Sequence, residues 1–61
     1  MAMDSLLTLG EQLTRWRTAQ ALSRSRLAHR VGVASSTVAR VESGAISPSA
    51  QLWLNLVDSL D

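Results

Sequence analysis

The chain has 61 residues, a formal net charge of +1, one histidine and no cysteine. This length is enough for one domain, residues 1–61, with a small hydrophobic core. Without cysteine there are no disulfide bonds or thiolate metal sites, and His29 has no carboxylate near it in the sequence, so we expect neither a metal nor a cofactor. No apolar run approaches the roughly 20 residues of a membrane helix, and no secretion signal is evident. These absences favour a cytoplasmic protein.

The basic residues are all arginines and are concentrated in the middle of the chain, where no acid occurs between Gln12 and Val41. They are Arg15, Arg17, Arg24, Arg26, Arg30 and Arg40. Such a cationic stretch between acid-bearing ends is typical of a phosphate-binding surface. It also fits a solvated helix face that happens to be basic, and charge alone does not separate the two.

The apolar pattern is helical throughout. The sequence has no sustained alternation of apolar and polar residues and no Asn-Gly or Asp-Gly turn, so strands are not expected. The first predicted helix has an apolar stripe at helical spacing, formed by Leu6, Leu9, Leu13 and Trp16. Its start is open, because Thr8 with Glu11 can form a capping box, while Asp4 or Ser5 can cap about one turn earlier.

Capping signals delimit two further helices. Ser23 is expected to cap a helix that stops at Gly32. A third helix over residues 35–43 is expected to end at Gly44. Both glycines suit the left-handed position that follows many helices.

The last predicted helix has a strong start signal, with Ser47 as N-cap and Pro48 as the first helical residue. Its broad apolar face comprises Leu52, Trp53, Leu56, Val57 and Leu60. The pattern as a whole predicts an all-α fold, a compact bundle of short helices.

Residues 24–43 have the helix-turn-helix spacing, two short helices joined by a tight turn. Ala28 occupies the position where a larger side chain would hold the helices apart, and Gly32 the position where the chain turns sharply. The side chains expected to fix the angle between the helices are Leu27, Val31, Val33, Val38 and Val41. The alternative is an ordinary helical hairpin inside a small bundle.

These residues resemble the lambda-repressor-like family of helix-turn-helix DNA-binding domains, also called the Cro/C1 or xenobiotic-response-element (XRE) type. The matching stretches are Leu9-Gly10, Arg17, Leu22-Ser23, Leu27-Ala28, Val31-Gly32-Val33, Ser36-Thr37-Val38, Glu42-Ser43-Gly44, Pro48-Ser49 and Leu56 to Leu60. The resemblance covers nearly the whole chain and implies a bundle of four or five short helices. It also implies that the helix over residues 35–43 enters the DNA major groove and that dimers bind near-palindromic operators.

Arg17 and Glu42 match the positions of an internal ion pair in that family, which joins the first helix to the end of the recognition helix. Both residues also project beside apolar stripes, where a charge is costly unless it is paired. We therefore expect a structural ion pair here rather than two solvated side chains.

The polar face of the helix over residues 35–43 is the surface expected to enter the groove. The expected contact residues are those of this face together with Thr37 beside it: Ser35, Ser36, Thr37, Ala39, Arg40 and Ser43. Arg40 is the only long donor among them, and arginine bonds guanine O6 and N7 bidentately; a phosphate contact or a solvated charge is the alternative. Arg24 lies where the family often has a phosphate-contacting glutamine, and Arg26 and Arg30 are expected to face phosphate or solvent.

Three positions depart from the family pattern. Ala34 stands where a serine or threonine often caps the recognition helix, so that Ser35 becomes a substitute cap. Ala21 stands where a glycine often ends the first helix, and Arg26 replaces a common acid. These departures leave open where the recognition helix starts and how the chain turns after the first helix.

The expected function is sequence-specific binding of double-stranded DNA by a transcriptional regulator of the repressor type. Catalysis is not expected, because paired carboxylates at useful spacing are missing. An antitoxin-type subunit that binds a toxin protein as well as its operator is the alternative, and a purely structural bundle is a third reading. We expect a homodimer through the Leu54 side of the last helix, in preference to Leu7, and association with the nucleoid of a prokaryote or with phage DNA.

Overall fold

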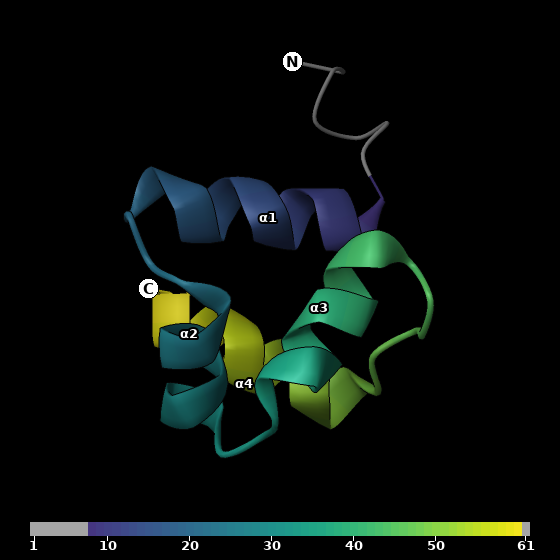
Figure 1. Ribbon diagram of the computed structural model, residues 1–61. Helices are drawn as coiled ribbons and strands as arrows, with labels where there is room; N and C mark the ends of the chain where they lie inside the picture. Colours follow the sequence, from purple (N-terminus) through teal and green to yellow (C-terminus); the bar gives the residue numbers. More distant parts are fainter. Residues whose placement is uncertain (1–7, 61) are drawn as a thin grey trace.

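The computed structural model describes residues 8–60, which form four helices and no strand. The helices are α1 (Leu9–Ala19), α2 (Arg24–Val31), α3 (Ser35–Ser43) and α4 (Ala50–Leu60). In Figure 1, α1 runs across the top, α2 and α3 lie below it, and α4 lies behind them. Both α3 and α4 pack against α1 and α2. The predicted all-α bundle is confirmed, and no helix within residues 8–60 has the length and apolar character needed to cross a membrane.

The start of α1 is a capping box. The Thr8 hydroxyl accepts a hydrogen bond from the Glu11 N–H at 3.1 Å, and Glu11 Oε1 accepts one from the Thr8 N–H at 3.0 Å. The hydrogen bond from the Thr8 backbone N–H to the carboxylate is the main cause that lowers the pKa of Glu11. Of the two starts open from the sequence, Thr8 is therefore the cap; Asp4 and Ser5 lie outside the described residues.

The apolar stripe predicted for α1 is only partly correct. Leu13 is fully buried, whereas Leu9 and Trp16 are 44% and 41% exposed, and Leu6 lies outside the described residues. Trp16 remains at the rim of the core, where its ring packs against Trp53 of α4 with the ring centroids 5.9 Å apart.

Gly10 explains why α1 turns a different face to the core. It is buried against the end of α3, and a Cβ placed on it would lie 2.5 Å from the Glu42 carbonyl oxygen. Only glycine lets the two backbones approach so closely. The inward face of α1 is therefore centred on Gly10 and Leu13, which moves Leu9 and Trp16 outwards.

The ends of α2 and α3 follow the sequence signals closely. The Ser23 side chain caps α2, and Gly32 and Gly44 end α2 and α3 with a left-handed φ of 82° each. Ala34 occupies the N-cap position of α3 and supplies no side-chain hydrogen bond, while Ser35 is already the first helical residue. The first turn of α3 therefore lacks a side-chain cap, and Ser35 does not replace it.

The predicted start of α4 is wrong by two residues. The helix begins at Ala50, and the Ser49 hydroxyl accepts a hydrogen bond from the Leu52 N–H at 3.1 Å. Ser47 and Pro48 instead belong to the connection that follows α3. Two serines flank Pro48, and the second of them caps the helix.

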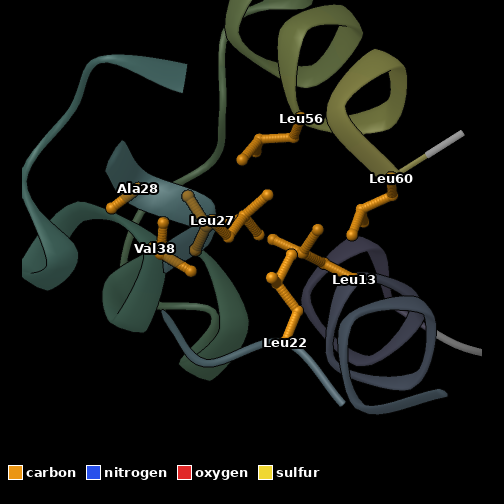
Figure 2. Close-up of a cluster of buried hydrophobic side chains, with 8 residues drawn as sticks. Leu13, Leu22, Leu27, Ala28, Val38, Leu56 and Leu60 are labelled. Carbon is orange, nitrogen blue, oxygen red and sulfur yellow. The ribbon is translucent and has the colours of Figure 1, made fainter. Parts of the chain in front are cut away.

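The core gathers where the four helices meet, and Figure 2 shows its leucines converging from α1, α2 and α4. Its buried members are Leu13, Leu22, Leu27, Ala28, Val38, Val41, Leu56 and Leu60. Leu22 enters from the corner after α1, where Ala21 adopts a left-handed φ of 54°. This is the position at which the family often has a glycine, and alanine adopts that conformation only with strain.

Candidate nucleic-acid interface

The outer face of α3 is a narrow surface of small side chains with one long one. At 100° per residue it covers about 140° of the helix circumference. Its members are Ser35, Ser36, Ala39, Arg40 and Ser43. All are exposed except Ala39, which is half-buried, and Thr37 lies half-buried beside them. Val38 and Val41 anchor the opposite face in the core.

The hydroxyls on this face differ in what they contact. Ser43 donates to the Arg40 carbonyl oxygen at 3.1 Å and accepts from the Ala45 N–H at 3.4 Å, so it helps to close the end of α3. The hydroxyls of Ser35 and Ser36 make no hydrogen bond within residues 8–60. These two side chains, at the start of the helix, remain available to a ligand.

The expected pair between Arg17 and Glu42 forms and joins α1 to the last turn of α3. Arg17 Nε lies 2.6 Å from Glu42 Oε2, and a second guanidinium nitrogen lies 3.2 Å from Oε1. The third nitrogen of Arg17 donates to the Leu22 carbonyl oxygen at 2.7 Å. The side chains are only 11% and 2% exposed, so the pair is buried between α1, the corner after it and α3.

Glu42 also binds Arg24, which the sequence assigned to phosphate alone. Arg24 Nε lies 2.8 Å from Glu42 Oε1, and the Arg24 side chain is 52% exposed. On the helical wheel Glu42 borders the outer face of α3 on the side of Ser35, whereas Arg40 lies at the opposite border. The small-residue face of α3 is therefore flanked by one arginine at each edge.

The electrostatics of Glu42 follow from these contacts. Burial raises the pKa of Glu42, but hydrogen bonds from Arg17 and Arg24 together with their positive charges outweigh burial and hold the pKa below its ordinary value. The carboxylate is therefore charged at neutral pH, and one negative charge faces two positive ones.

Arg26 and Arg30 lie apart from this surface, on the outer side of α2, where they border a shallow pocket with Ser25 and His29. Arg30 donates a hydrogen bond to the Ser59 carbonyl oxygen at 3.2 Å, near the end of α4. The structure thus places Arg24 and Arg40 at opposite borders of the outer face of α3 and groups Arg26 with Arg30 elsewhere.

Two features of the site were missed from the sequence. The contact of Arg24 with Glu42 had a signal, because Glu42 is the first acid after an acid-free stretch, residues 12–41, that contains all six arginines. The packing of Gly10 against the backbone of Glu42 also had a signal in the sequence. A glycine inside a helix destabilises it by about 1 kcal/mol relative to alanine, so its presence indicates a close contact that only glycine allows.

The geometry of the motif and the comparisons with known proteins point to the same family. Gly32 turns the chain between α2 and α3, as the helix-turn-helix motif requires. Among residues 8–60 no cluster of three potential metal ligands is found. A family model described as a helix-turn-helix domain matches residues 8–61, in agreement with the lambda-repressor-like resemblance, although its description names no subtype. No curated protein and no solved structure matches the chain. The chain belongs to the helix-turn-helix domain family.

Proposed function

We propose that the protein is a sequence-specific regulator of transcription, of the repressor type, that binds double-stranded DNA with α3 in the major groove. The observation that carries this proposal is the exposed small-residue face of α3 with Arg24 and Arg40 at its edges. Small side chains allow the helix backbone to approach base edges, and Arg40 can read a guanine bidentately. Such a regulator would act in the cytoplasm of a prokaryote, where chromosomal and phage DNA are found, and no catalytic step is assigned to it.

Phosphate contacts belong to the same proposal. Arg24 lies at the first turn of α2, where helix N–H groups and a guanidinium both favour an anion. Ser35, Ser36 and Thr37, at the start of α3, supply further hydroxyls. Arg26 and Arg30 contribute long-range attraction rather than contact, since they lie together on the outer side of α2, apart from the face of α3.

We assign the protein a homodimeric state on DNA, with the Leu54 side of α4 as the contact. Leu54 is 56% exposed, more than any other large apolar side chain described. One α3 presents a single long base-reading side chain, so specific affinity is expected to need two half-sites about 34–36 Å apart. Leu7, the weaker candidate, lies outside the described residues.

The proposed function is tested by selecting bound sequences from a random duplex library with the purified protein. We expect enrichment of an inverted repeat whose half-sites contain a guanine and are separated by about one helical turn, 10–10.5 base pairs. Binding without any enriched sequence would reduce the function to non-specific DNA association. No duplex binding at all would contradict the proposal.

The dimer is tested by light scattering with the enriched duplex. The wild-type complex is expected to contain two protein chains, and Leu54→Glu to reduce it to one. Ile46→Glu is the matched control, because Ile46 is an exposed apolar residue on the α3–α4 connection, 39% accessible. A wild-type complex with one chain per duplex would end the dimer assignment, and a dimer unaffected by Leu54→Glu would move the contact elsewhere.

A further inference from the structure

The two arginines that share Glu42 use their guanidinium groups differently. Arg17 is nearly buried, and each of its three side-chain nitrogens donates to the protein, two to Glu42 and one to the Leu22 carbonyl oxygen. Arg24 is half-exposed and donates only through Nε. Its two terminal nitrogens make no hydrogen bond within the described part of the chain.

This arrangement fixes the orientation of the Arg24 guanidinium. The group is planar, so holding Nε on the carboxylate also sets the direction of the terminal nitrogens. An arginine that is free in solvent loses rotamer freedom when it binds an anion, and an arginine held in place beforehand loses less. The carboxylate cancels one of the two positive charges, and the remaining one resides largely on the exposed Arg24 side chain.

We propose that Glu42 is a positioning residue for DNA binding as well as part of the folded core: it holds Arg24 by Nε and turns the two terminal nitrogens towards a DNA phosphate beside α3. The inference rests on the proposed DNA-binding function. It gives Glu42 an effect on affinity that is transmitted through Arg24, in addition to its effect on folding through Arg17.

A double-mutant cycle separates these two effects. Duplex affinity is measured as a function of salt for wild type, Arg24→Ala, Glu42→Gln and the double variant, at a temperature where tryptophan fluorescence shows each to be folded. Arg24→Ala is expected to weaken wild-type binding by about tenfold and to lower the log–log salt slope by about 0.9, the contribution of one phosphate. In the Glu42→Gln background the same change is expected to weaken binding by less than about threefold.

Arg40→Ala is the control, because Arg40 does not contact Glu42 and should cause the same loss in both backgrounds. Equal losses for Arg24→Ala with and without Glu42 would overturn the positioning role and leave DNA binding intact. A wild-type protein with no salt-dependent duplex binding would overturn the proposed function together with the inference.

Arg24→Lys provides a test that leaves the buried pair of Arg17 and Glu42 in place, in case Glu42→Gln does not fold. Lysine keeps the charge but has a single nitrogen, which cannot bond the carboxylate and a phosphate through separate groups as arginine does. We expect Arg24→Lys to lose nearly as much affinity as Arg24→Ala. Affinity equal to that of the wild type would show that charge alone suffices and would contradict the role of Glu42.

Discussion

At the scale of single residues, Glu42 is the most deeply buried charged side chain within residues 8–60, and it receives three hydrogen bonds from two arginines. A buried charge is tolerated because such bonds replace its hydration. A domain of this size has a free energy of unfolding of only about 3–9 kcal/mol. The loss of this one carboxylate is therefore comparable with the stability of the whole fold.

Glu42→Ala is expected to lower the free energy of unfolding by about 3–5 kcal/mol, because Arg17 would remain buried without a charge partner. Asp58→Ala is the control, since Asp58 is exposed on α4. Thermal or urea unfolding, followed by fluorescence of the Trp16 and Trp53 pair between α1 and α4, measures both changes. Coincident unfolding curves for the two variants would show that the ion pair adds nothing to stability.

The same residue makes the domain sensitive to acid. Because the pKa of Glu42 is lower in the folded chain than in the unfolded one, the folded state binds fewer protons. Its stabilising effect is complete above the ordinary glutamate pKa of about 4.3 and is lost as the pH falls through the lowered value. The free energy of unfolding should therefore decrease steeply below about pH 4, and Glu42→Gln should flatten that decrease. Parallel pH profiles for the two proteins would contradict this prediction.

At the scale of the elements, helix ends were more predictable than helix faces. Ser23, Gly32 and Gly44 act locally through their own backbone conformations and hydrogen bonds, so the sequence alone identifies the ends of α2 and α3. Leu9 and Trp16 are exposed because the backbone of α1 approaches α3 at Gly10, a contact between segments about 30 residues apart. The periodicity of apolar residues within one helix does not reveal how closely that helix approaches another.

The difference between local signals and contacts of distant segments also explains two other errors, the start of α4 and the missed contact of Arg24 with Glu42. Ser47 and Ser49 are equally good caps by composition, and the path of the connection after α3 decides between them. The bond between Arg24 and Glu42 joins α2 to the end of α3, so only the folded angle of the motif reveals it. The composition of the α3 face was predictable because it depends on the position of each residue around a single helix.

Gly10→Ala tests the close approach of α1 and α3. Helix propensity alone predicts that alanine stabilises α1 by about 1 kcal/mol. The added Cβ would instead lie 2.5 Å from the Glu42 carbonyl oxygen, so we expect a net loss of about 1–3 kcal/mol as the helices separate. The sign of the change in melting temperature decides, and an increase would contradict the packing described.

Ala34→Ser tests the uncapped start of α3. Serine at the N-cap can accept a hydrogen bond from the N–H of Ser36, because the Thr37 N–H already donates to the Ala34 carbonyl oxygen, and this should stabilise the domain by about 1 kcal/mol. This corresponds to an increase in melting temperature of about 4–8 °C for a domain of this size. Ala45→Ser, in the connection after α3, is the control; equal melting temperatures for the two variants would argue against a missing cap.

At the scale of the whole molecule, the four arginines of α2 and α3 are divided between two regions. Arg24 and Arg40 flank the outer face of α3, whereas Arg26 and Arg30 lie on the outer side of α2. A net charge of +1 is too small to hold DNA by itself, so binding depends on where the charges lie. Under the proposed function, Arg40 reads a base and Arg26 supplies only general attraction.

Base reading by the outer face of α3 is tested most directly by comparing Arg40→Ala with Arg26→Ala on an enriched duplex and on random duplex DNA. We expect Arg40→Ala to lose about 1–3 kcal/mol of binding free energy on the enriched site and little on random DNA, and to lose the preference for one guanine. Arg26→Ala should cause a small loss that is equal on both. A loss from Arg40→Ala that is equal on enriched and random DNA would contradict the claim that the outer face of α3 reads bases.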